Sequence, residues 1–181
     1  NGIDPNVIPS QKSDFFLYGG ITRNVRLKDV PSCYISLVKI STSRVSKERA
    51  ETSIDVEVEN HGARVIEGEI EAIINDPNGN SIVKDTKRTL LPSGKSMITV
   101  SIPTLKDPSL WSPEHPTLYT MIVNLKSSRK IIDSYAERFG YRWYEFKEHG
   151  PFLLNGERLL LRGTHRHEEW SGLGNALPDS L

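Results

Sequence analysis

Short stretches of alternating apolar and polar residues follow one another through the middle of the chain. Ile54, Val56 and Val58, for example, alternate with Asp55 and Glu57. A period of two places the apolar side chains on one face of a β-strand and the polar ones on the other. We therefore predict seven short strands, near residues 35–40, 54–58, 66–74, 81–90, 97–102, 119–125 and 131–139.

The segments between these stretches have the composition of turns. Asp76-Pro77-Asn78-Gly79-Asn80 predicts a hairpin, because Asn-Gly readily adopts positive φ angles. Leu91-Pro92-Ser93-Gly94 predicts another turn, and Gly68 predicts a β-bulge inside the third strand. No window keeps a 3.6-residue period for three turns, so we expect no long helix. The pattern as a whole predicts an all-β protein built on an immunoglobulin-like β-sandwich.

The flanking segments differ from the middle of the chain. Residues 21–27 alternate and predict a half-buried strand. Residues 152–162 predict a hairpin around Asn155-Gly156, and the polar stretch from Gly163 to Trp170 follows it. Residues 171–181 lack periodicity and suggest a loop that enters a helix. Because the chain begins without Met and ends without a tail, we expect both of its ends to be cut.

Composition narrows the function classes. Lys and Arg together number 23, as do Asp and Glu, so the formal net charge is zero. This balance argues against a nucleic-acid partner, which selects a basic surface. No apolar run is long enough for a transmembrane helix, so no membrane partner is expected. Cys33 is the only cysteine and excludes an internal disulfide.

Candidate chemistry gathers in His165-x-His167-Glu168-Glu169. Alternate residues of a strand share a face, so His165, His167 and Glu169 could hold a metal ion. They could equally form an ion-pair and hydrogen-bond cluster, or the polar wall of a ligand site, which is the interpretation we prefer. No nucleophile or metalloprotease motif is present, and no carboxylate pair stands out as general acid and base. We therefore predict no catalytic residue, no metal site and no cofactor in this chain.

Two aromatic segments have structural interpretations. Trp111 and Tyr119 are expected to cover the end of the sandwich core, although a flat ring here could also stack on a sugar. Arg23 follows Gly19-Gly20, whose spacing is not that of a phosphate-binding loop. We expect Arg23 to form an ion pair with a neighbouring domain.

Four segments, in this order, resemble glycoside hydrolase family 2, the family of β-galactosidases, β-glucuronidases and β-mannosidases. They are Asp14-Phe15-Phe16-x-Tyr18-Gly19-Gly20-Ile21-x-Arg23-x-Val25-x-Leu27; Leu110-Trp111-Ser112-Pro113-Glu114-x-Pro116-x-Leu118-Tyr119; Phe139-Gly140-Tyr141-Arg142 with Phe152-Leu153-Leu154-Asn155-Gly156; and Leu161-Arg162-Gly163-x-x-Arg166-His167-Glu168. Together they span nearly the whole chain.

The resemblance implies three parts. Residues 1–32 would be the C-terminal end of a jelly-roll sugar-binding domain, residues 33–141 the sandwich, and residues 142–181 the truncated start of a (β/α)8-barrel catalytic domain. Family members use two barrel Glu residues in a retaining mechanism. Both would lie beyond Leu181.

The resemblance also assigns substrate contacts. His167 matches the His of the family's Arg-His-Glu motif, which lines the sugar subsite in β-galactosidases. Glu169 falls where β-glucuronidases carry an acidic residue that touches sugar. Thr164, His165 and Trp170 depart from the family pattern and leave the sugar open.

We therefore expect an accessory part of a retaining exo-β-glycosidase. Terminal β-galactosides are the first candidate substrates, and glucuronides or mannosides are the next. Its partners would be the β-linked glycoside and the neighbouring jelly-roll and barrel domains, in a periplasmic or secreted setting by family habit. Alone, the chain would be inactive, and its role would be to space the two domains and help shape the rim of the active site. Its residues beyond about 150 would be poorly ordered, or would pack on the sandwich or on a neighbouring molecule. The alternatives are a non-catalytic carbohydrate-binding or adhesion module, and a metal-binding module on His165 and His167.

Overall fold

The structure, a computed structural model, describes residues 19–165 and 169–178. The chain divides into two compact units, one of residues 29–161 and one that combines residues up to 28 with residues from 162 onward. All the strands belong to the larger unit. The described residues include no helix, as the pattern predicted, and so none that could cross a membrane.

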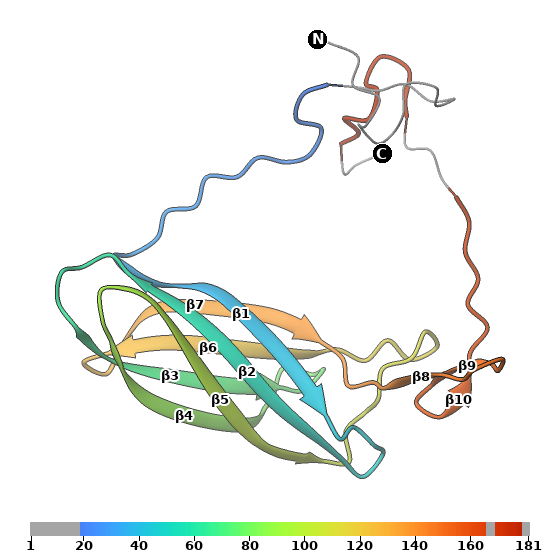
Figure 1. Ribbon diagram of the computed structural model, residues 1–181, viewed down its shortest axis with the longest axis horizontal. Helices are drawn as coiled ribbons and strands as arrows, with labels where there is room; N and C mark the ends of the chain where they lie inside the picture. Colours follow the sequence, from blue (N-terminus) through green and yellow to red (C-terminus); the bar gives the residue numbers. More distant parts are fainter. Residues whose placement is uncertain (1–18, 166–168, 179–181) are drawn as a thin grey trace. The chain divides into compact units, whose positions relative to one another are not determined.

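Seven antiparallel strands of the larger unit form two sheets, which face each other as layers (Figure 1). The three-stranded sheet has the order β1-β2-β5, with β1 at Cys33–Ser43, β2 at Arg49–Asn60 and β5 at Gly94–Lys106. The four-stranded sheet has the order β4-β3-β6-β7, with β3 at Ile66–Asn75, β4 at Ser81–Leu91, β6 at Tyr119–Ser127 and β7 at Lys130–Phe139. The prediction of an immunoglobulin-like sandwich is confirmed.

The core lies between the two sheets and follows from the alternation. Every second residue of β2 from Ala50 to Asn60 is buried, and the residues between them are more exposed. At the side of the sandwich, where β1 meets β7, the Ile35 amide donates to Asp133 Oδ2 at 2.8 Å. This bond satisfies a backbone donor on an edge strand, which would otherwise be open to pairing with another chain. Cys33 is buried in the same core, and burial raises the pKa of its thiol.

Gly68 does not form the predicted bulge. It pairs regularly with Thr89 on one side and Ser127 on the other. A Cβ at this position would lie 2.5 Å from Leu91 Cδ1 and 3.1 Å from Leu91 Cγ. The glycine is therefore explained by the close approach of Leu91, a packing requirement that alternation does not reveal.

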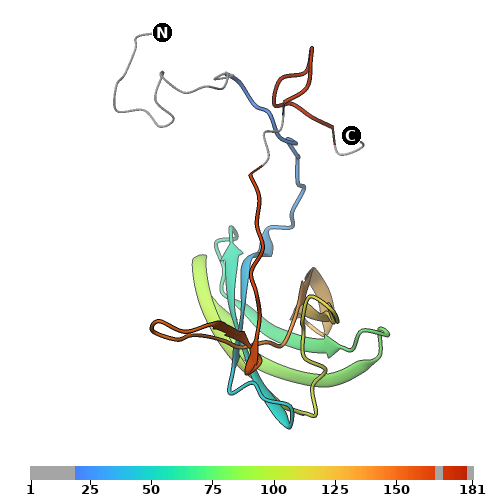
Figure 2. The same ribbon diagram turned by 90° about the vertical axis from the view of Figure 1, so that its right-hand side faces the viewer.

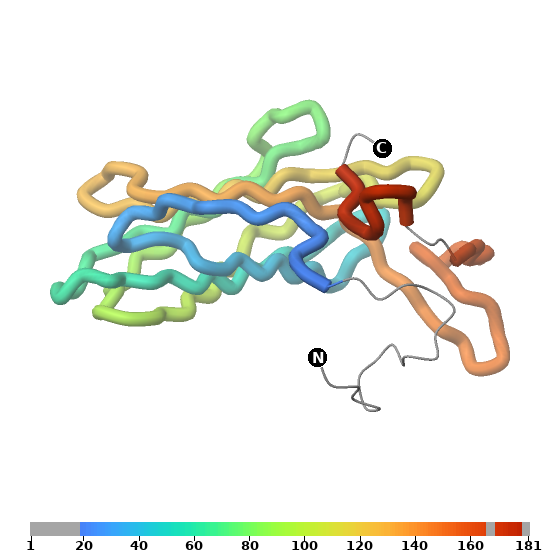
Figure 3. Tube along the Cα trace, turned by 90° about the horizontal axis from the view of Figure 1, so that it is seen from above, coloured from blue at the N-terminus to red at the C-terminus, as the bar shows by residue number. Residues whose placement is uncertain are grey.

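Two hairpins in the four-stranded sheet use different turn chemistry. The predicted turn at Asp76–Asn80 is confirmed: the Gly79 amide donates to the Asp76 carbonyl, and Gly79 has a φ of 88°. In Figure 3 it is the green loop that projects from the sandwich. The β6–β7 turn consists of Ser128 and Arg129, whose φ angles of 50° and 65° are both in the left-handed region. Such a two-residue turn favours Asn-Gly, so Ser-Arg holds it at a conformational cost.

One carboxylate is buried on the outward-facing side of β3. The Glu71 side chain is 5% exposed, and it forms ion pairs with Lys84 and Lys126, the latter at 2.8 Å. Asn124 donates to Glu71 Oε2 at 2.9 Å, and Ser134 donates in turn to Asn124. Burial alone would raise the Glu71 pKa, but the bonds from Lys126, Lys84 and Asn124 outweigh it and lower the pKa to about 2. The network ties β4, β3, β6 and β7 together.

A third, small sheet lies beyond one end of the sandwich. Figure 2, which views the sandwich from that end, shows it in front of the two layers. Its order is β10-β9-β8, with β8 at Tyr144–Phe146, β9 at Phe152–Leu154 and β10 at Glu157–Arg158. The hairpin predicted around Asn155-Gly156 is confirmed, because these two residues join β9 to β10 with φ angles of 52° and 84°.

The strand predicted over residues 21–27 is absent from the described part of the chain. Residues 21–27 are irregular, and Ile21, Val25 and Leu27 are all exposed. Alternation marks a segment that could form a strand, but a strand also needs a partner to receive its backbone hydrogen bonds. No described segment pairs with these residues.

Candidate functional site

Of the two predicted substrate-binding residues, the structure describes only Glu169. His167 lies in residues 166–168, outside the described part of the chain. Glu169 is described and is half-buried, next to the exposed Trp170. Among the described residues, no three His, Cys, Asp or Glu side chains group as metal ligands. Because His167 is not among them, the metal hypothesis on His165 and His167 stays a prediction.

A tight loop follows Glu169. The Trp170 amide donates to the Gly174 carbonyl at 3.1 Å, and the Gly174 amide donates back at 2.9 Å. Gly172 and Gly174 both have positive φ angles, which glycine adopts without steric cost. Residues 171–178 form a loop, as suggested, and residues 179–181, where a helix could begin, lie outside the described part of the chain. The loop therefore holds the backbone directly after Glu169 in a defined conformation.

Arg23 connects two segments that lie far apart in the sequence. Its Nη1 donates to the carbonyl oxygen of Asn175 at 3.1 Å, in the unit formed by the two ends of the chain. Arg23 and the end of the loop after Glu169 are thus neighbours in space. This bond is to a backbone carbonyl of the same unit, and the expected ion pair of Arg23 with a neighbouring domain stays a prediction.

A junction attaches the small sheet to the sandwich, and its first element is the loop that contains Trp111. The Trp111 amide donates to the Tyr141 carbonyl at 2.8 Å. A Cβ on Gly140 would lie 2.8 Å from Trp111 Cβ, so only glycine lets the two segments approach this closely. The Arg142 guanidinium lies 4.7 Å from the centre of the Trp111 ring, in cation–π geometry.

Tyr141 anchors this junction in the sandwich core. It is fully buried, and its ring meets Tyr119 and Phe139 edge-on at centroid distances of 4.9 and 5.1 Å. Its hydroxyl lies 2.8 Å from Thr52 Oγ1 of β2, and burial raises its pKa despite that hydrogen bond. Tyr119 covers the end of the core, as predicted, and its hydroxyl accepts from the Ser109 amide.

Asn155 joins the three parts of the junction. Its Nδ2 donates to the Trp111 carbonyl at 3.0 Å, and its Oδ1 accepts from the Trp143 amide at 3.1 Å. Its own amide donates to the Trp143 carbonyl at 2.9 Å. The side chain thus bridges the sandwich loop and the segment that enters β8, from a left-handed position that Asn tolerates. The sequence indicated the turn, but the bridge depends on contacts distant in sequence and was missed.

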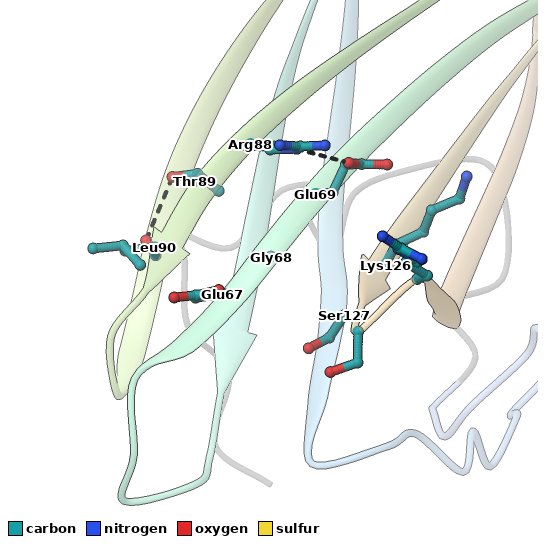
Figure 4. A pocket seen from close by; sticks show the side chains of 10 residues that line it. Glu67, Gly68, Glu69, Arg88, Thr89, Leu90, Lys126 and Ser127 are labelled. Carbon is teal, nitrogen blue, oxygen red and sulfur yellow. Dashed lines mark hydrogen bonds and ion pairs between the residues drawn. The ribbon is translucent and has the colours of Figure 1, made fainter.

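Grooves lie both at the junction and on the four-stranded sheet of the sandwich. A groove of about 410 Å³ lies at the junction and is lined by charged and polar residues that include Lys47, His115, Asn155, Glu157 and Arg158. The larger groove, of about 870 Å³, lies on β3, β4 and β6 and is shown in Figure 4. There Arg88 Nε lies 3.3 Å from Glu69 Oε2, and Lys126 stands on the neighbouring strand. Both grooves mix charges of both signs.

Two of the four motif segments, those that contain Trp111 and Asn155, are thus brought together at the junction. The model of the family described as glycosyl hydrolases family 2 matches residues 33–142, which is more than half of the chain. The chain belongs to this family.

Relatives within family 2 include both glucuronidases and galactosidases. One relative is a Formosa agariphila protein named "Putative beta-glucuronidase". It is 44% identical to this chain over 177 residues, which are 98% of this chain and 21% of that protein. A beta-galactosidase of Thermoanaerobacter pseudethanolicus is 34% identical over 93% of this chain and 22% of its own. The chain spans about a fifth of the length of these curated relatives.

Solved structures agree in fold. The crystal structure of a Bacteroides uniformis beta-glucuronidase matches 96% of this family 2 chain with a TM-score of 0.89 and 31% identity, over 22% of that protein's chain. The resemblance inferred from the motifs is therefore confirmed. The assignments of residues 1–32 to a jelly roll and residues 142–181 to a barrel stay predictions.

Proposed function

We propose that this chain is the central part of a retaining exo-β-glycosidase and that the 181 residues alone do not hydrolyse glycosides. The observation that carries the proposal is its membership of family 2 combined with its length, about a fifth of each curated relative. The hydrolytic activity would then reside mainly in the part of the longer protein that lies outside these 181 residues. The chain's own role is to hold the neighbouring domains at a set spacing through the Trp111–Tyr141–Asn155 junction and to shape the rim of the active site.

The strongly lowered pKa of the Glu71 carboxyl group does not support catalysis by the chain itself. A general acid in glycoside hydrolysis needs a raised pKa. The Glu71 pKa is instead lowered to about 2, and its two oxygens are occupied by Lys84, Lys126 and Asn124. Glu71 is therefore a structural carboxylate.

β-Glucuronides are the substrates we place first. The support is the higher identity to the Formosa agariphila protein, 44% against 34% for the beta-galactosidase, together with the Bacteroides uniformis structure. β-Galactosides, which the sequence alone placed first, are the second candidate, favoured by the beta-galactosidase relatives. His167 and Glu169 are the proposed sugar contacts, by their positions in the family motif.

Hydrolysis of nitrophenyl β-glucuronide and β-galactoside tests this proposal. We expect the longer protein that contains this chain to hydrolyse one of them, with glucuronide preferred, and the purified 181-residue chain to hydrolyse neither. Turnover by the purified chain would refute its inactivity. A reading frame beyond Leu181 without a barrel pattern and its two Glu residues would instead favour the carbohydrate-binding or adhesion module.

The site residues need their own variants in the longer protein. His167→Ala is expected to lower kcat/KM about tenfold, the equivalent of one hydrogen bond of ~1.4 kcal/mol. His165→Ala is the matched control, since that position departs from the family pattern, and it should change kcat/KM much less. Equal losses, together with a zinc-dependent rise in melting temperature that His167→Ala abolishes, would favour the metal hypothesis.

A further inference from the structure

Three aromatic side chains share one face of the small sheet. Tyr144 and Phe146 alternate on β8, and Phe146 pairs across the sheet with Phe152 of β9. Tyr144 is 64% exposed and Phe146 is 73% exposed. Their ring centroids lie 5.7 Å apart, and the Phe152 ring is 6.2 Å from Tyr144 and 5.0 Å from Phe146. We call Tyr144, Phe146 and Phe152 the aromatic face.

The aromatic face is unlike the other exposed apolar residues of this unit. Leu37 and Met97 are exposed on separate strands of the sandwich, β1 and β5. Scattered exposed residues of this kind are normal, whereas a contiguous patch marks an interaction surface. The small sheet also has strands of only three, three and two residues, and sheets this small need packing against something else for stability.

The ring geometry distinguishes between kinds of partner. A sugar stacks on the flat face of a ring, so a platform for an extended glycan needs rings that lie parallel. Here the planes of Tyr144 and Phe152 are 27° apart, but the Phe146 plane is tilted by 74° from Tyr144 and by 53° from Phe152, so the three rings do not form one flat platform. Tilted, edge-to-face rings are the arrangement of protein interiors. The partner is therefore a protein surface with apolar side chains.

The size of the aromatic face distinguishes a covalently attached partner from a separate one. Three aromatic side chains supply about 150–250 Å² each when fully exposed, and these three are already partly buried, so the aromatic face offers less than the ~800 Å² that each partner buries in a stable complex between separate proteins. A partner on the same polypeptide has a high effective concentration, so a smaller patch suffices. The relatives carry about four-fifths of their length outside the matched region, and in the Bacteroides uniformis beta-glucuronidase the matched region is 22% of that chain.

We infer that the aromatic face is the docking surface for the polypeptide that continues beyond residue 181 in the longer protein. This inference rests on the proposed function, because it requires the longer chain. It goes beyond it by naming the surface: the rings of Tyr144, Phe146 and Phe152 are covered by apolar side chains of the following domain, which completes the small sheet's packing.

Hydroxyl-radical footprinting with mass spectrometry tests the inference on unaltered protein. Modification rates of Tyr144, Phe146 and Met97 are measured in the 181-residue chain and in the longer protein, each relative to the same residue in urea-unfolded protein. We expect Tyr144 and Phe146 to be modified severalfold more slowly in the longer protein than in the 181-residue chain. Met97, an exposed residue of β5, is the control and should change little.

Three outcomes would overturn the inference. One is equal modification of the two aromatic residues in both proteins. Another is a 181-residue chain that sediments as a dimer with these residues protected and becomes monomeric on Phe146→Ser, since the partner is then a second copy. The third is protection of the 181-residue chain by a soluble β-glycan. Glycoside hydrolysis measured on the same samples separates this inference from the proposed function, because an active longer protein with unprotected rings refutes only the inference.

Discussion

The sandwich and the small sheet are built from the same kind of strand but are stabilised in different ways. The sandwich encloses its apolar residues between two sheets and buries Ile54, Met121 and Tyr141 completely. The small sheet leaves Tyr144 and Phe146 exposed, and its side-chain hydrogen bond to the Trp111 loop comes from Asn155. The difference shows that the sandwich is a complete folding unit, whereas the small sheet depends on its neighbours.

The largest effect should come from the sandwich core. Ile54→Ala removes buried methyl groups from the centre of β2 and should cost about 2–5 kcal/mol of unfolding free energy. Urea denaturation measures this loss. Leu37→Ala, on the exposed outer side of β1, is the control and should cost less than about 0.5 kcal/mol. Similar losses for both variants would contradict a core closed between the two sheets.

The junction should give a local effect of about 2–3 kcal/mol for Asn155→Ala, because two side-chain hydrogen bonds are lost and alanine disfavours a φ of 52°. Hydrogen exchange should accelerate in residues 144–158 and stay unchanged in β2 and β3. Asn155→Gly keeps the turn but loses the bridge, so it isolates the contribution of the amide. Faster exchange throughout the sandwich would show that the two regions are not separate.

The Glu71 network should have a smaller, pH-dependent effect. Glu71→Gln should cost about 1–2 kcal/mol near neutral pH, because Gln can still accept from Asn124 while the partly exposed lysines reach water. The folded Glu71 pKa of about 2 lies below the ordinary 4.5, so ionisation stabilises the fold above pH 4.5 and this contribution disappears as the pH falls towards 2. Thermal unfolding of both proteins from pH 7 to pH 2 should show the two stabilities converging. A gap that is constant with pH would refute the ion-pair explanation.

The smallest effect concerns a turn, and it should be stabilising. Arg129→Gly replaces a left-handed non-glycine residue in the β6–β7 turn and should stabilise the sandwich by about 0.5–1 kcal/mol. The matched change in the small sheet is Gly156→Ala, which places a Cβ at a φ of 84° close to Trp143 and should destabilise it. Chemical denaturation and hydrogen exchange, respectively, measure the two changes. A destabilising Arg129→Gly would indicate that the Arg129 side chain makes contacts that outweigh the backbone cost.

Much of the sandwich could be predicted from the sequence because its determinants are local. The alternation in β2 and the turn residues Asp76, Pro77 and Gly79 each act within a few positions, and the strands they predict are present. The strand predicted over residues 21–27 shows the limit of this reasoning. Alternation states which face of a strand would be apolar, but it does not supply a partner strand.

Contacts between distant residues account for what was missed. Gly68 was interpreted as a bulge, although its role is to make room for Leu91, more than twenty positions away. The Asn155 bridge to Trp111 is likewise invisible in the local pattern. For the candidate site, Glu169 is half-buried, and His167 lies outside the described residues, so its role still depends on the family motif.

The buried Cys33 is an intrinsic probe of how often the sandwich opens. Its thiol is 2% exposed at the start of β1, and it is the chain's single cysteine. A thiol reagent can reach the sulfur only when β1 separates from its neighbours, so the labelling rate reports how often that separation occurs. The same chain can thus be monitored at one atom, without an added probe, while the end that carries the small sheet is altered.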